Sequence, residues 1–167
     1  PRGKKLPAAD YGLNVHLPDG RGVYTFCMCP GGEVISAASE TGGVVTNGMS
    51  YSGRAGKNAN SALLVSVAPG DFPYAGPLGG AMWQREIERR AFEYALGRYL
   101  APAQLVGDFL AGKASAGPGR VEPSCRPGVF WGDLRCVLPE VVSASMTKAL
   151  PLLGRKLHGF GAPDAVL

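Results

Sequence analysis

The chain has 167 residues, of which 46% are hydrophobic and 18% charged, and a net charge of +4. This composition is typical of a folded globular protein and argues against global disorder. No apolar run approaches the roughly 20 residues that a membrane-spanning helix needs, and no signal peptide is visible, so we expect no membrane partner. The only tight basic cluster is Arg2, Lys4 and Lys5, which we interpret as a solvated tail.

The first half of the chain is predicted to be β. Residues 23–28 alternate in character and are rich in aromatic and β-branched types, which predicts a strand. Pro30-Gly31-Gly32 predicts a turn after it, and residues 33–38 resume as the second strand of a hairpin. A third short strand is expected at residues 44–46, and a buried strand at residues 61–67.

The second half is predicted to be helical. Between residues 81 and 99, apolar residues recur at helical spacing, and Glu86 and Arg90 form a well-oriented i,i+4 pair on the charged face. A shorter helix is expected over residues 102–110, ending at Gly112.

The last part of the chain carries further helix signals. Asp133 is placed to cap a brief turn, and Pro139 suits the start of a final helix. The pattern as a whole predicts an α+β fold with three parts. They are a β-rich region with a polar Gly/Asn loop (1–76), a helical region (77–160) and the start of a strand (161–167). Because the chain starts at Pro1 and ends in an apolar run, we interpret it as an internal piece of a longer protein.

Two nucleotide-binding motifs are present only in part. Gly107 to Lys113 has the glycine and lysine spacing of a P-loop, but Ala114 stands where a Ser or Thr should hold magnesium, and the motif follows a helix pattern. The GxG pairs at 117–119 and 159–161 lack the third glycine and the strand-to-helix context of a dinucleotide site. We therefore expect neither site within this chain.

The titratable residues form no recognisable catalytic set. His16 and His158 are far apart, and neither has an acid or a nucleophile near it in the sequence, so both are interpreted as structural. The four cysteines lack the CxxC pairs of structural zinc sites, so no metal is expected.

Cys27 and Cys29 raise a separate question. On a regular strand, residues two positions apart lie near the outer distance limit for a disulfide, which disfavours a stable bridge between them. Reduced thiols in a cytoplasmic protein are the default expectation. Three interpretations stay open at this point: a redox pair, small residues beside a ligand, and core packing.

A candidate ligand loop follows the first strands. Pro30-Gly31-Gly32 allows close backbone approach to a flat or bulky group. The polar, glycine-rich stretch after residue 46 supplies uncharged hydrogen-bonding groups, namely Asn47, Ser50, Asn58, Asn60 and Ser61. The alternative is a hairpin with an ordinary polar surface loop.

Several blocks of the chain together resemble a bacterial family of uncharacterised FAD-dependent dehydrogenases, also described as NAD(P)/FAD-dependent oxidoreductases. The blocks are residues 26–34, 45–51, 58–65, 101–110, 138–140 and 159–167. The resemblance implies that FAD-binding Rossmann segments lie outside this chain, which would be the substrate-side region that covers the flavin. It also implies that the isolated piece is inactive, that the intact protein is an enzyme acting on a small molecule, and that NAD(P)H is a possible electron donor.

The resemblance also suggests site residues. We expect residues 29–32 and 47–50 to reach the substrate cavity, with Pro30, Gly31, Gly32, Asn47, Gly48, Met49 and Ser50 as cofactor-binding candidates. Cys27 and Cys29 are the weak catalytic candidates. The competing hypothesis is a non-enzymatic, RNA-associated binding module that uses the basic isoelectric point near 9.0. The scattered basic residues do not favour it, and no nucleic-acid partner is expected.

Overall fold

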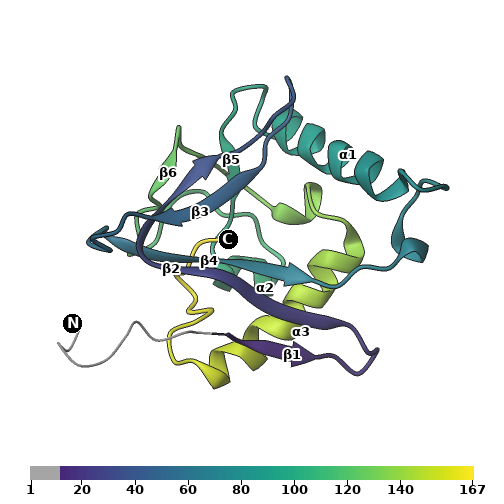
Figure 1. Ribbon diagram of the computed structural model, residues 1–167. Coiled ribbons are helices and arrows are strands. Elements are labelled where there is room, and N and C mark those ends of the chain that lie inside the picture. Colours follow the sequence, from purple (N-terminus) through teal and green to yellow (C-terminus); the bar gives the residue numbers. More distant parts are fainter. Residues whose placement is uncertain (1–11) are drawn as a thin grey trace.

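One long strand organises the fold. The computed structural model describes residues 12–167 (Figure 1), so the predicted basic tail at Arg2, Lys4 and Lys5 lies outside the described residues. The strands are β1 (Asn14–His16), β2 (Gly22–Ser36), β3 (Thr46–Ser50), β4 (Asn58–Val65), β5 (Ala101–Ala103), β6 (Cys125–Arg126) and β7 (Val129–Trp131). The helices are α1 (Gly79–Tyr94), α2 (Val106–Ala111) and α3 (Glu140–Lys156). The fold class is α+β, as predicted.

β2 is the centre of a five-stranded sheet. Its first half pairs antiparallel with β1 and β4, and its second half pairs antiparallel with β3 and parallel with β6. The predicted hairpin at Pro30-Gly31-Gly32 is wrong, because the chain continues through these residues as one strand. Two register shifts against β4, between Phe26 and Cys29 and between Cys29 and Gly32, accommodate the glycines and the proline.

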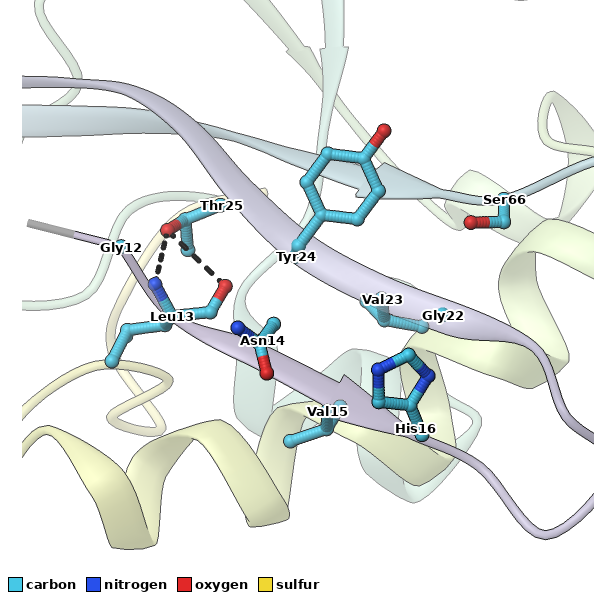
Figure 2. A pocket seen from close by; sticks show the side chains of 10 residues that line it. All are labelled: Gly12, Leu13, Asn14, Val15, His16, Gly22, Val23, Tyr24, Thr25 and Ser66. Atoms are coloured by element: carbon cyan, nitrogen blue, oxygen red, sulfur yellow. Dashed lines mark hydrogen bonds between the residues drawn. The ribbon is translucent and has the colours of Figure 1, made fainter.

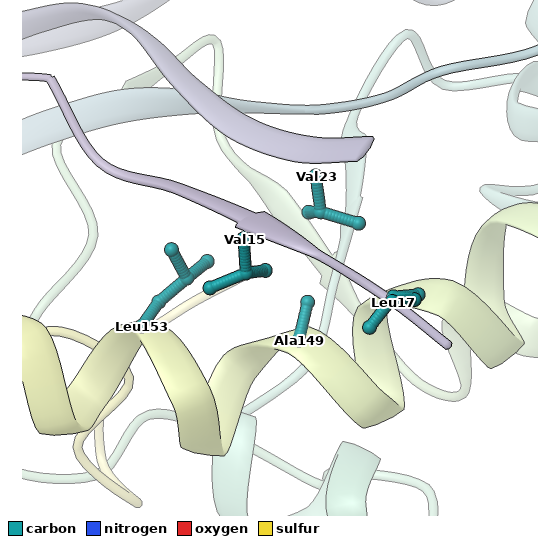
Figure 3. Close-up of a cluster of buried hydrophobic side chains, with 5 residues drawn as sticks. All are labelled: Val15, Leu17, Val23, Ala149 and Leu153. Carbon is teal, nitrogen blue, oxygen red and sulfur yellow. The ribbon is translucent and has the colours of Figure 1, made fainter. Parts of the chain in front are cut away.

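One face of the sheet packs on α3. Val15, Leu17 and Val23 point from β1, β2 and the turn between them onto Ala149 and Leu153 of the helix (Figure 3). Val23, Ala149 and Leu153 have no exposed surface. A second cluster continues along the helix through Met146 and Leu150 to Phe109 of α2. The three-to-four-residue spacing of the buried residues of α3 is that of one helix face.

Two predicted helix boundaries need correction. α1 ends at Tyr94 rather than near residue 99, because Leu96 and Gly97 adopt left-handed φ angles of 57° and 69° that a helix cannot continue through. The helix expected over residues 102–110 begins only at Val106, since residues 101–103 pair with β7 as β5.

Other sequence signals are confirmed. Gly112 is the left-handed C-cap of α2, which explains the P-loop-like spacing as a helix end. The Asp133 carboxylate accepts a hydrogen bond from the Arg135 N–H at 3.0 Å, and α3 begins directly after Pro139. Arg90 and Glu86 form the predicted ion pair at 2.7 Å.

The last three residues are extended and pair with residues 104–106. The Gln104 and Leu167 backbones exchange hydrogen bonds of 3.1 and 2.8 Å, and the Val106 N–H donates to Ala165. The return of this segment to a further domain stays a prediction. Among residues 12–167, no helix has both the length and the apolar character to cross a bilayer.

Candidate functional site

The glycines of the first candidate segment lie where the chain crosses itself. A Cβ on Gly31 would stand 2.2 Å from the Arg54 carbonyl oxygen, and a Cβ on Gly32 would stand 2.2 Å from that of Met49. Gly31 also accepts a hydrogen bond from the Gly56 N–H at 3.0 Å. The connection between β3 and β4 therefore passes against β2, and this close approach requires residues without a side chain.

Asn60 completes this crossing. Its side-chain amide donates to the Glu33 carbonyl oxygen at 3.2 Å, while its Oδ1 is buried and has no hydrogen-bond donor. A Cβ on Gly48 would stand 2.0 Å from that oxygen, so Oδ1 faces the Cα hydrogens of Gly48. The Asn60 side chain, which comes from β4, thus contacts both Gly48 of β3 and Glu33 of β2.

The structure brings the two predicted segments together. Gly32 lies opposite Ser50 in the β2–β3 ladder, and Met49, Gly48 and Asn47 follow in register along β2. Pro30 and Asn47 are exposed, and Gly48, Met49 and Ser50 are half-buried. The missing Cβ atoms of Gly31, Gly32 and Gly48 face the chain's own atoms, so these glycines serve the crossing. Their role in cofactor binding stays a prediction.

The cysteines lie on a β-bulge. Between the pairs Phe26–Ala62 and Cys29–Asn60, β2 has two residues, Cys27 and Met28, where β4 has only one. Cys27 is exposed and adopts a left-handed φ of 48°, which glycine usually occupies in such bulges. Cys29 is half-buried, and both cysteines are free thiols.

The sheet face opposite α3 is open among the described residues. Val23 and Thr25 are buried on the α3 side, so Tyr24 and Phe26 point the other way, and they are 41% and 58% exposed. Their partners on β4 are Leu64, which is half-buried, and Ala62, which is exposed. We call the surface formed by Tyr24, Phe26, Ala62 and Leu64 the open face. It includes the trough at its end, which is described next.

A trough lies at one end of the open face (Figure 2). It has a volume of about 400 Å³, and five polar side chains line it, those of Asn14, His16, Tyr24, Thr25 and Ser66. Among residues 12–167, no carboxylate, lysine or arginine lines it. Beneath it, the Thr25 hydroxyl accepts a hydrogen bond from the Leu13 N–H at 3.0 Å and holds the entry of the chain into β1.

An ion pair fixes the edge of the trough. The Arg21 guanidinium donates to both oxygens of Asp71, at 2.9 and 3.1 Å, and to the Ser66 carbonyl at 2.6 Å. The hydrogen bond from Arg21, and then that from the Ala68 N–H, lower the pKa of the Asp71 carboxyl below its ordinary value. This arrangement ties the loop after β4 to the β1–β2 turn, and with it the position of Ser66.

Sequence reasoning missed the open face. The sequence alone predicts a structural role for His16 and indicates only strand formation for Tyr24 and Phe26. The available signal is the pair of large aromatic residues, Tyr24 and Phe26, that alternates with the buried pair Val23 and Thr25. A strand face that is solvated usually carries polar residues instead. Within residues 12–167, no three His, Cys, Asp or Glu side chains gather in a way that would hold a metal ion.

Comparison with known proteins identifies the family. Residues 1–167 match the family described as "FAD-dependent protein, C-terminal domain-like". The chain belongs to this family. It is also 46% identical over 164 residues to a protein of Clostridium beijerinckii described as "Uncharacterized protein". That match covers 98% of this chain and 31% of the relative, so the chain spans about a third of the relative's length.

The described residues fit one part of FAD and not another. The open face offers exposed aromatic rings and uncharged polar groups, which suit the flat isoalloxazine ring. None of the three glycine-rich motifs follows a strand and opens a helix. The P-loop-like stretch ends α2, residues 117–119 lie between α2 and β6, and residues 159–161 follow α3. A pyrophosphate site of the Rossmann kind is thus absent from residues 12–167.

Proposed function

We propose that this chain is the substrate-side region of an FAD-dependent oxidoreductase, and that its open face turns toward the flavin and the substrate. Membership of an FAD-dependent family supports the flavin context. The observation that carries the orientation is that Tyr24 and Phe26 are exposed side by side on a sheet whose other face is filled by α3. Two large rings exposed next to each other on one sheet face offer an apolar surface that a partner can cover.

The lining of the trough suggests how the chain acts in such an enzyme. When bound, FAD supplies the hydride chemistry, and the protein supplies orientation and electrostatics. Asn14, Tyr24 and Ser66 offer neutral donors and acceptors, which favour an uncharged, planar part of the ligand. Phe26 and Leu64 exclude water from the same face.

The finer assignments belong to the same proposal. Pro30, Gly31, Gly32 and residues 47–50 contribute backbone groups to the flavin or substrate, and Asn47 and Ser50, whose side chains point to opposite faces of β3, contribute hydrogen-bonding side chains. FAD-binding segments of the same polypeptide are the partner, NAD(P)H is the electron donor, a small molecule is the substrate, and the protein is a cytoplasmic dehydrogenase. Family membership supports this reading over an RNA-binding module.

A matched pair of variants tests the orientation in the intact protein. Phe26→Asp places a carboxylate on the open face, and Leu96→Asp places one on the loop after α1, where the residue is 65% exposed. If Phe26 is covered by the flavin-binding part, Phe26→Asp slows flavin reduction or weakens FAD retention by about tenfold or more, since burying an unpaired carboxylate costs several kcal/mol. Leu96→Asp leaves both unchanged. Equal behaviour of the two variants would refute the orientation, while a colourless intact protein that binds no flavin would refute the function itself.

A further inference from the structure

The bulge of β2 changes the relation between Cys27 and Cys29. In a regular strand, their side chains would be held apart at the outer limit for a disulfide. Here the Cys29 Sγ folds back to 3.2 Å from the Cys27 carbonyl oxygen. Because the intervening Cα–C and C=O bonds are short, this sulfur lies within about 6 Å of the Cys27 Cα. The bulge therefore places the Cys29 sulfur against the Cys27 residue itself.

The backbone of Cys27 is a second observation. Its φ of 48° is left-handed, which costs an L-residue roughly 1–2 kcal/mol relative to its preferred conformations. Cys27 is exposed, so packing of its side chain does not offset this cost. Strain kept at an exposed reactive side chain is a pointer to function rather than to packing.

The other two cysteines of the chain, Cys125 and Cys136, differ from Cys27 and Cys29 in their surroundings. Burial raises the pKa of the Cys125 thiol, which lowers the share of its reactive thiolate form. Cys136 is exposed and free, and it lies at the end of the 3-10 turn that precedes α3. Only Cys27 and Cys29 combine access to solvent with a second thiol two residues away.

We propose that Cys27 and Cys29 form a reversible dithiol–disulfide pair that exchanges with low-molecular-weight disulfides. The Cys27 thiolate attacks one sulfur of the disulfide, whose S–S bond breaks and releases one thiolate. The Cys29 thiolate then attacks the Cys27 sulfur of the mixed disulfide and releases the second thiolate. The chain loses two electrons, the disulfide is reduced to two thiols, and the two cysteine protons pass through solvent to the two leaving groups. This site requires neither flavin nor substrate.

Tryptic peptides separate the cysteines for the test. Cleavage after Arg21 and Arg54 gives the peptide 22–54, which contains Cys27 and Cys29 and no other cysteine. Cys125 falls in the peptide 121–135, because the Arg126–Pro127 bond resists trypsin, and Cys136 falls in 136–148. The protein is equilibrated with reduced and oxidised glutathione, trapped by alkylation and analysed by mass spectrometry.

The dependence on glutathione concentration distinguishes a pair from single thiols. At a fixed ratio of reduced to oxidised glutathione, a tenfold rise in total glutathione should lower the disulfide-to-dithiol ratio of peptide 22–54 about tenfold, because two thiols are released per disulfide formed. The glutathione adduct of Cys136 should not change, because one thiol is released there. Glutathione on both Cys27 and Cys29, or two alkylated thiols while Cys136 carries glutathione, would overturn the proposal.

Two single-residue variants test the pairing of the cysteines without relying on a change that could unfold the chain. Cys27→Gly removes one thiol and suits the left-handed backbone, so the fold is retained. Cys29→Ser removes the other. In each variant, the remaining cysteine should form only the glutathione adduct, with no dependence on total concentration. A concentration-dependent oxidised form that persists in either variant would contradict the pairing.

Discussion

The crossing of the β3–β4 connection against β2 makes a sharp prediction for Gly31→Ala. The new Cβ would stand 2.2 Å from the Arg54 carbonyl oxygen, 2.5 Å from its carbonyl carbon and 2.9 Å from the Gly56 nitrogen, all of which are backbone atoms that no rotamer change can move. Gly31 also has a φ of 58°. The left-handed conformation costs roughly 1–2 kcal/mol in alanine, and forced overpacking typically costs about 1–3 kcal/mol more. We therefore expect a loss of about 2–5 kcal/mol in the free energy of unfolding.

Gly53→Ala is the matched control on the same connection. A Cβ there meets nothing within 4 Å, and the φ of Gly53 is not left-handed, so we expect a change within about 0.5 kcal/mol. Urea unfolding followed by the fluorescence of Trp83 and Trp131 measures both variants. If Gly31→Ala and Gly53→Ala are equally stable, β2 does not run beneath this connection as described.

Two other residues give independent tests of the packing and the electrostatics. Leu153→Ala, in the fully buried face of α3, should cost about 2–5 kcal/mol in urea unfolding, whereas Leu157→Ala, at the partly exposed C-cap of α3, should cost under about 1 kcal/mol. Because Arg21 lowers the folded-state pKa of Asp71, the contribution of this ion pair to stability is complete above the unfolded pKa of about 4 and is lost as pH falls through the lower folded value. In the Asp71→Asn variant, Tm should therefore fall less steeply below about pH 4 than it does in the unchanged protein. An equally steep fall of Tm in both proteins would contradict the role of the Arg21–Asp71 pair.

The elements that sequence reasoning predicted well carry local signals. The end of α2 at Gly112, the cap at Asp133 and the start of α3 after Pro139 each depend on one residue whose backbone or side chain acts within a turn.

The elements that sequence reasoning did not predict depend on contacts between residues far apart in the sequence. Pro30-Gly31-Gly32 has the composition of a turn, yet here the same glycines allow distant backbone to pass against an uninterrupted strand. Nothing local distinguishes the two uses of glycine. Likewise, residues 101–103 become a strand only because β7, nearly thirty residues on, offers a pairing edge. The open face could not be predicted, because strand periodicity shows that a strand has two faces but does not show which face other elements cover.

The most direct measurement of the central claim is hydroxyl-radical footprinting of the intact, FAD-loaded protein. Tyr24 and Tyr99 are the same residue type and are both 41% exposed in this structure, but only Tyr24 lies on the open face. If the open face packs toward the flavin-binding part, Tyr24 is oxidised much more slowly than Tyr99, and removal of FAD raises its rate. Equal oxidation of the two tyrosines, with and without FAD, would contradict the account.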